Sequence, residues 1–226
     1  MAIKKNETES VVIKPLEIVT TQVKIVGDTP LIMHAWSEKA KRMMLEAQQG
    51  KKKGKAKEIR NPVRDFIDSM YWTSHKPDVP DNATEEECEI LFAEAIKAGA
   101  TFGFPATAFK QGAQSAAYRL GWVKNQMGLR GAFFIDSDEN GLVQIDSDVP
   151  VIREDMVKIV GTTDIRYRGE FRNWSTVLTI RYNRNSDFSL DSIFSAMNAG
   201  GFVCGVGEWR PEKDGDFGRY HIEPVI

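Results

Sequence analysis

The sequence contains few of the residues from which metal and thiol sites are built. Its 226 residues include only two cysteines, Cys88 and Cys204, and three histidines, His34, His75 and His221. The cysteines are far apart and form no metal or redox motif, and no pair of histidines has metal-ligand spacing. No serine lies in a nucleophile-elbow motif. We therefore expect neither a metal nor a cofactor, and a reducing, intracellular setting.

Long apolar runs and an excess of one charge are also missing. No run approaches the roughly 18 apolar residues that a membrane helix needs. The first ten residues, MAIKKNETES, lack the apolar segment of a secretion signal. These features favour a cytoplasmic protein without membrane contact. The net charge is −2, so an argument for nucleic-acid binding must come from the local distribution of charge.

The first half of the chain combines one strand with several helices. Residues 17–26 are rich in β-branched residues that alternate, which predicts a strand. Residues 62–71 can form a short helix or a strand. Helix signals, including an N-cap serine at Ser37 and a capping box at Thr84, occur in 37–49, 84–99 and 106–120.

The second half is mostly strand. Asn140-Gly141 predicts the turn of a hairpin between two apolar segments. Residues 188–198 have helical spacing of apolar residues, and Gly200-Gly201 should end that helix. Further strands are expected within 149–161, 164–171, 173–183 and 217–226.

Without insertions, the order is strand, helix, strand, strand, helix, strand. This order predicts an α+β fold of the ferredoxin-like type (split βαβ, RRM-like), an antiparallel sheet with helices on one face. Both 37–49 and 106–120 qualify as its first helix. If the second is correct, residues 38–104 are a large insertion carrying a basic loop. We expect one domain over residues 1–226, with 1–16 as a flexible arm.

The C-terminal stretch concentrates glycine among β-type and aromatic residues. Six of the 18 glycines lie between Gly200 and Gly218, together with Trp209, Arg210 and Arg219. Glycine lets a backbone take positive φ and lets a phosphate come close, so a glycine-rich hairpin here suits a sugar-phosphate chain. The alternative is a strained turn that needs glycine for geometry alone.

Two other segments are basic. Residues 51–60 contain six basic residues and one acid, as expected of a mobile loop. Between residues 166 and 184, five arginines accompany a single acid, Glu170, with aromatic residues between them. Arginine beside aromatics suits phosphate contacts and base stacking on single strands. The alternative is a strand with a basic outer face and an aromatic core face.

Two motif readings are weaker. DSDENG places Asp136, Asp138 and Asn140 as in a calcium loop, but Ser147 stands where a bidentate glutamate is needed. A polar turn explains these residues. GVGEWRPEKDGDFG has no Gly-Lys-Ser/Thr and precedes a strand, so it is neither a phosphate loop of NTPases nor a dinucleotide motif.

The order of elements, with a glycine-rich segment between the second helix and the last strand, resembles the RAMP superfamily of CRISPR-associated proteins. The nearest members are the backbone subunits that polymerise along a guide RNA, in which this loop has the form G-x-G-x(n)-G-x-G. Here it corresponds to Gly205-Val206-Gly207, then EWRPEKDG, then DFGR. Gly215 and Gly218 are separated by two residues where the family pattern has one. The chain is short for the family, which favours a compact relative encoded by a phage or mobile element.

The resemblance implies a non-catalytic protein that binds single-stranded RNA or DNA and forms side-by-side homo-oligomers or filaments. Trp209 would stack on a base, and Arg210 and Arg219 would contact phosphates. A runner-up hypothesis is a metal-independent endoribonuclease with His34 as general base, and a third is an assembly protein whose glycine hairpin makes only subunit contacts. The expected nucleic-acid contacts are Lys52, Lys53, Lys55, Arg60, Arg168, Arg172, Gly205, Gly207, Trp209, Arg210, Gly218 and Arg219.

Overall fold

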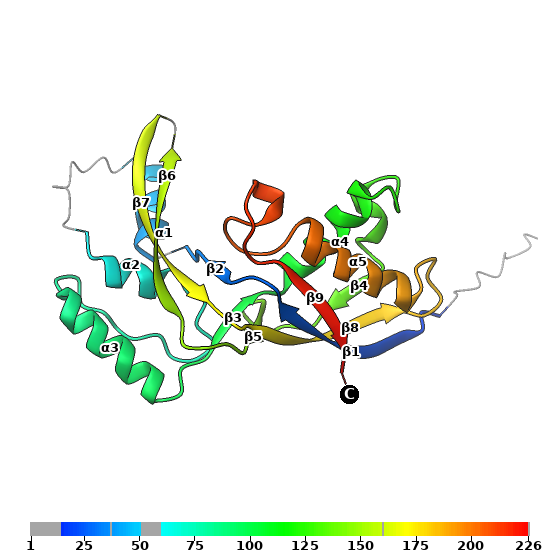
Figure 1. Ribbon diagram of the computed structural model, residues 1–226, viewed down its shortest axis with the longest axis horizontal. Helices are drawn as coiled ribbons and strands as arrows, with labels where there is room; N and C mark the ends of the chain where they lie inside the picture. Colours follow the sequence, from blue (N-terminus) through cyan, green and yellow to red (C-terminus); the bar gives the residue numbers. More distant parts are fainter. Residues whose placement is uncertain (1–14, 37, 51–59, 160, 226) are drawn as a thin grey trace, which may run out of the picture.

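The computed structural model describes residues 15–36, 38–50, 60–159 and 161–225. In this part the chain is a mixed α+β protein with five α-helices and antiparallel sheets (Figure 1). The strands and helices in chain order are β1 Ile18–Gly27, β2 Leu31–Met33, α1 Glu38–Gln48, α2 Pro62–Asp68, α3 Glu85–Lys97, β3 Phe102–Pro105, α4 Ala106–Arg119, β4 Phe133–Ile135, β5 Leu142–Ile145, β6 Val151–Ile159, β7 Thr162–Phe171, β8 Ser175–Asn183, α5 Leu190–Val203 and β9 Tyr220–Pro224.

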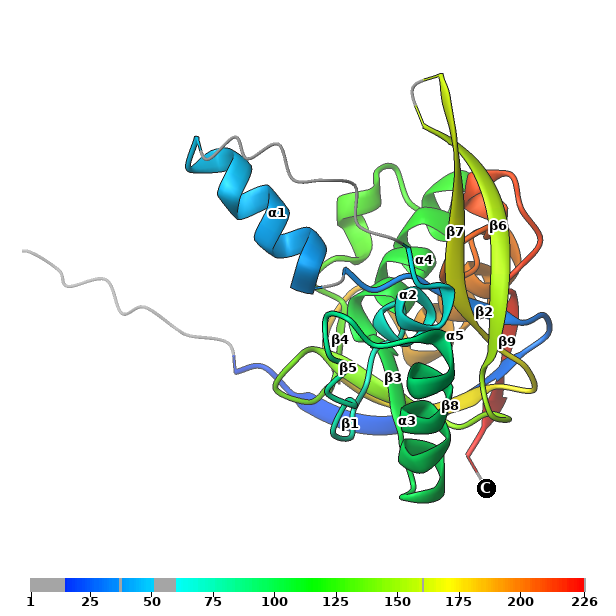
Figure 2. The ribbon, with the colours of Figure 1, turned by 90° about the vertical axis from the view of Figure 1, so that its left-hand side faces the viewer.

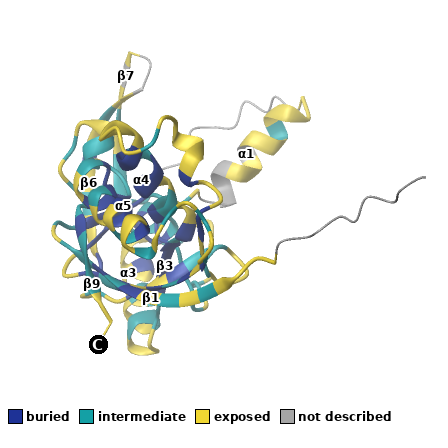
Figure 3. Cartoon of the chain, turned by 90° about the vertical axis from the view of Figure 1, so that its right-hand side faces the viewer, coloured by how far each residue is buried: buried dark blue, intermediate teal, exposed yellow. Residues whose placement is uncertain are grey.

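The largest sheet has four antiparallel strands in the order β4-β8-β1-β9. The β-branched alternation of β1 buries Val23 and Ile25, which lie opposite Leu178 and Thr176 of β8. Helices α4 and α5 pack on each other above this sheet (Figure 1), and Figure 3 shows the buried residues between helices and strands. The main core therefore lies between one face of the sheet and the two helices.

A second, three-stranded sheet has the order β2-β7-β6 and lies with α2 and α3 in the left half of Figure 1. Its strands β6 and β7 form a long hairpin that projects beyond the helices (Figures 1 and 2). A short pair, β3-β5, lies between the two halves. None of the described helices has the length and apolar character needed to span a membrane.

The helix predictions for the first half are confirmed. The Thr84 hydroxyl accepts a hydrogen bond from the Glu87 amide, and the Glu87 carboxylate accepts one from the Thr84 amide, so the capping box of α3 is complete. Residues 62–68 are helical, as α2. The expected insertion, residues 38–104, contains α1, α2, α3 and most of β3. The cap at Ser37, the basic residues of 51–59 and residues 1–14 of the expected arm lie outside the described residues.

The predicted end of the last helix at Gly200-Gly201 is wrong. Helix α5 continues through both glycines to Val203. The missing side chains serve close packing: a Cβ on Gly200 would lie 2.8 Å from the Ala113 amide nitrogen of α4. On Gly201 it would lie 1.9 Å from the Tyr220 carbonyl oxygen of β9. The two glycines allow α5 to pack closely against α4 and β9. This tertiary packing outweighs the poor helix propensity of glycine.

The predicted hairpin around Asn140-Gly141 is wrong in its pairing, although the turn exists. Gly141 has a φ of +77°, and the Asp138 carboxylate accepts hydrogen bonds from the Asn140 and Leu142 amides. The strands on either side do not pair with each other. Strand β4 joins β8 in the large sheet, whereas β5 joins β3.

Candidate nucleic-acid interface

Two hollows in the protein surface share His34 as a lining residue. This histidine directly follows β2, whose residues Leu31 to Met33 are fully buried and pair with β7. One hollow has a volume of about 200 Å³ and the other about 260 Å³, and His34 lines both. We call the two hollows together the His34 cleft.

The smaller hollow combines aromatic and charged side chains. Trp36 is 63% exposed, and Tyr167 faces the same hollow from β7. The Arg60 guanidinium lies 5.5 Å from the centre of the Tyr167 ring and pairs with Asp65 at 2.6 Å and Asp164 at 2.9 Å. An aromatic surface beside arginine is therefore present, but the arginine already has acidic partners.

The larger hollow is bounded by the glycine-rich segment. Its lining includes Gly205, Gly207 and Arg210 of this segment, together with Tyr71 and Gln111. The Glu208 amide donates to the Ile32 carbonyl oxygen at 2.9 Å, so the segment crosses β2 just before His34. This crossing brings Glu208 of the C-terminal segment next to His34, which stands 174 positions earlier in the chain.

The glycine-rich segment is an irregular loop around a short 3-10 helix, Pro211–Lys213, and not the predicted hairpin. Gly218 has a φ of +65°, and a Cβ there would lie 1.7 Å from the Val206 carbonyl oxygen. Gly207 has a φ of +81°, and its Cβ would lie 2.5 Å from the Ile32 carbonyl oxygen. Backbone geometry and close packing therefore account for these glycines without a ligand.

Glu208 links His34 to a chain of buried charges. Its carboxylate lies 3.7 Å from His34 Nδ1 and 3.4 Å from Arg168 Nη2. The interaction with His34 holds the pKa of the Glu208 carboxyl below its ordinary value; burial opposes this effect, and Arg168 strengthens it. Burial, together with Glu208, raises the pKa of the Tyr71 hydroxyl, which stays protonated at neutral pH. The site thus holds a carboxylate beside an imidazole and a phenol.

Glu170 is the single acid within residues 166–184, but each of the five arginines of this stretch pairs with at least one carboxylate in the fold. Arg166 and Arg172 pair with acids two positions away, and the other three pair with acids that lie elsewhere in the sequence. Arg168 is only 4% exposed and pairs with Asp155 at 3.0 Å. The other four pairs are Arg166–Asp164, Arg172–Glu170, Arg181–Asp136 and Arg184–Glu17.

The aromatic residues between these arginines are mainly core residues. Phe171 and Trp174 are at most 1% exposed, and Tyr182 is 8% exposed. Only Tyr167 reaches the cleft. The alternative interpretation, an aromatic core face, therefore describes this stretch.

The other predicted contact residues are dispersed. Trp209 is 37% exposed and lines neither hollow. Arg210 pairs with Glu212 and donates to the Gly207 carbonyl oxygen at 2.9 Å. Arg219 is half-buried and donates to the Asp216 carbonyl oxygen. Arg172 is exposed and pairs with Glu170. Lys52, Lys53 and Lys55 lie outside the described residues.

Sequence reasoning missed two residues of the cleft, Trp36 and Glu208. Trp36 stands two positions after His34 in LIMHAW, and a tryptophan just past a short apolar strand was the available signal. No local signal could identify Glu208, because its role depends on the loop crossing β2. Among the described residues, no three histidine, cysteine, aspartate or glutamate side chains are grouped so as to hold a metal ion.

Comparison of the chain with models of known protein families gave no match, and neither did a search of curated proteins. The functional argument therefore rests on the geometry of the cleft.

Proposed function

We propose that the protein binds single-stranded RNA or DNA in the His34 cleft, without catalysis. The observation that carries the proposal is the smaller hollow, where the exposed Trp36 and the half-buried Tyr167 lie beside Arg60 and Arg166. A base can stack on an exposed aromatic ring while arginine contacts the adjacent phosphates, and this mode tolerates any base sequence. The cleft then replaces the glycine-rich segment as the main contact surface.

The arginines of the cleft retain capacity for phosphate although they pair with acids. Arginine carries five N–H donors. Arg60 uses Nε for Asp65 and Nη1 for Asp164, and among the described residues its Nη2 donors have no acceptor, so they remain for a phosphate. The acids hold the guanidinium in place, so less side-chain entropy is lost when a phosphate binds.

The strand order supports the same proposal. We interpret β1-α4-β4-β8-α5-β9, with the sheet order β4-β8-β1-β9, as a ferredoxin-like split βαβ arrangement. The glycine-rich segment then lies between its second helix and its last strand, as in the RAMP backbone subunits that the sequence resembles. Homo-oligomers along the strand and a cytoplasmic location in a prokaryotic or phage-infected cell belong to this proposal.

Two exposed tryptophans give a matched test. Trp36 lies in the cleft and is 63% exposed, whereas Trp122 is 54% exposed and lies outside the cleft. Because stacking on one base contributes about 1–3 kcal/mol, Trp36→Ala should weaken binding of a fluorescent single-stranded oligonucleotide by about tenfold or more. Trp122→Ala should leave oligonucleotide binding by the single, unassembled protein chain nearly unchanged. Equal effects of the two variants in fluorescence anisotropy would refute the assignment of the cleft.

The runner-up function is a metal-independent endoribonuclease. It is favoured by one observation, the Glu208 carboxylate 3.7 Å from His34 Nδ1, which can orient the imidazole as a general base for a ribose 2′-hydroxyl. Incubation with RNA in the presence of a chelator tests it. Cleavage that His34→Ala abolishes would establish this function, and intact RNA with the unaltered protein would exclude it.

A further inference from the structure

Helix α1 presents an apolar surface that the rest of the described chain leaves exposed. Met44 is 47% exposed and Leu45 is 54% exposed. Arg42, also exposed, lies one turn before Leu45 on the same side of the helix. Figure 2 shows the helix standing away from the body of the molecule. A short amphipathic helix in this position gains little stability from its own chain.

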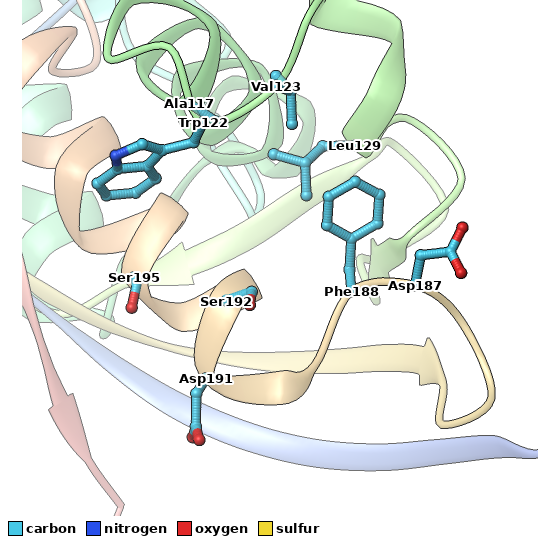
Figure 4. Close-up of a pocket in the computed structure, with 9 residues that line it drawn as sticks. All are labelled: Ala117, Trp122, Val123, Leu129, Asp187, Phe188, Asp191, Ser192 and Ser195. Atoms are coloured by element: carbon cyan, nitrogen blue, oxygen red, sulfur yellow. The ribbon is translucent and has the colours of Figure 1, made fainter.

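A second exposed apolar surface is a groove between the end of α4 and the start of α5. Its volume is about 500 Å³ (Figure 4). Trp122, Val123, Leu129 and Phe188 supply apolar side chains, and the carboxylates of two aspartates stand at its edge (Figure 4). Neither aspartate forms an ion pair with another described residue. The complete lining is Ala117, Trp122, Val123, Leu129, Asp187, Phe188, Asp191, Ser192 and Ser195.

We propose that α1 of one copy docks in this groove of a second copy. The two surfaces are complementary in chemistry: Met44 and Leu45 would enter the apolar groove, and Arg42 would approach Asp187 and Asp191. An amphipathic helix in an apolar groove is a common recognition mode, and opposite charges at its edge fix the orientation.

The positions of the two surfaces determine the kind of assembly. Helix α1 lies in the left half of Figure 1, and the groove lies at α4 and α5 in the right half. A contact between two different surfaces is heterologous, so each added copy leaves one helix and one groove open. The result is a ring or a filament. This inference deepens the homo-oligomer part of the proposed function but requires no nucleic acid.

Disulfide trapping tests the contact directly. Cys88 and Cys204 are buried and free, so an added surface cysteine reacts without competition from them. Leu45→Cys and Ser195→Cys, prepared separately and mixed under mild oxidation, should form a disulfide-linked heterodimer. Glu89→Cys on α3 is an exposed control outside the groove and should form little heterodimer with Leu45→Cys. No heterodimer with Ser195→Cys, or equal yields with both partners, would overturn the proposal.

A double variant excludes docking within one chain. If Leu45→Cys and Ser195→Cys in the same chain form an internal disulfide whose yield is independent of dilution, the helix occupies its own groove and the proposal is wrong. The expected product is intermolecular and disappears on dilution.

A variant without cysteine gives a second readout. Leu45→Asp should raise the concentration for half-association by about tenfold or more in sedimentation velocity, because a charge replaces a buried apolar contact. Leu45→Met is the control and should associate normally. A protein that stays monomeric at all accessible concentrations would overturn the proposal.

The same measurements with and without a single-stranded oligonucleotide separate this inference from the proposed function. Trapping without any oligonucleotide binding would leave the inference intact and refute only nucleic-acid binding. Oligonucleotide binding without disulfide trapping would support nucleic-acid binding and overturn the proposed contact between copies.

Discussion

The most informative stability test is Gly201→Ala, for which two physical effects predict opposite changes in the free energy of unfolding. Gly201 lies inside α5, where alanine is favoured over glycine by about 1 kcal/mol through helix propensity. Its Cβ, however, would lie 1.9 Å from the carbonyl oxygen and 2.6 Å from Cδ2 of Tyr220. The nearest atom belongs to the backbone of β9, so no side-chain rotation can relieve the overlap.

Overpacking of a close contact typically costs about 1–3 kcal/mol and sometimes more. An overlap with a backbone atom should cost an amount near the upper end of this range. After the gain in helix propensity is subtracted, Gly201→Ala should destabilise the protein by about 1–3 kcal/mol. For a chain of this length the melting temperature should fall by roughly 3–10 °C.

Gly112→Ala in α4 is the matched control. Its nearest neighbour would be the Tyr220 hydroxyl oxygen at 3.7 Å, an ordinary contact, so propensity should dominate and stabilise the protein by up to about 1 kcal/mol. Denaturant unfolding and thermal melting of both variants provide the comparison. A stabilised Gly201→Ala variant would refute the packing of α5 against β9 described above.

Two further predictions concern the charge network. Arg168→Met should destabilise the protein by about 2–4 kcal/mol in urea unfolding, because it leaves the buried Asp155 carboxylate with one fewer cation. Arg172→Met, at an exposed position, should cost less than about 1 kcal/mol. Similar losses of stability in the two variants would contradict the burial of Arg168. For Glu208, a pKa lowered in the folded state means that its stabilising effect is present above pH 4.5 and is lost as the pH falls through the lowered pKa. The stability difference between the unaltered protein and Glu208→Gln should therefore shrink in melts below about pH 4.5, and a difference that grows there would reverse the assigned sign.

Local patterns were sufficient to predict several elements. The β-branched alternation of β1, the capping box of α3 and the small residues of α4 each depend on neighbours within a few positions, and all three are present in the structure. The turn at Asn140-Gly141 was predicted for the same reason. The pairing of the two flanking strands was not predicted, because each pairs with a strand elsewhere in the sequence, β4 with β8 and β5 with β3. The turn does not determine these partners.

The charge balance around the arginines could not be predicted from the local sequence. Arg168 lies in an arginine-rich segment, but Asp155 from β6 and Glu208 from the C-terminal loop neutralise it in the folded chain. The glycines show a similar limit: Gly200 and Gly201 resemble a helix end in sequence, and only the positions of α4 and β9 explain why they lie inside a helix. The cleft at His34 arises from such long-range contacts, which is why Trp36 and Glu208 escaped prediction.

The most direct test of single-strand binding is the dependence of oligonucleotide affinity on salt concentration. If Arg60, Arg166 and Arg210, the arginines that line the cleft, each neutralise one phosphate, the slope of log affinity against log salt should be about −2 for a single strand. Between 50 and 200 mM salt, the dissociation constant should then rise by about twentyfold. A flat response, or no binding at the lower salt concentration, would contradict the account.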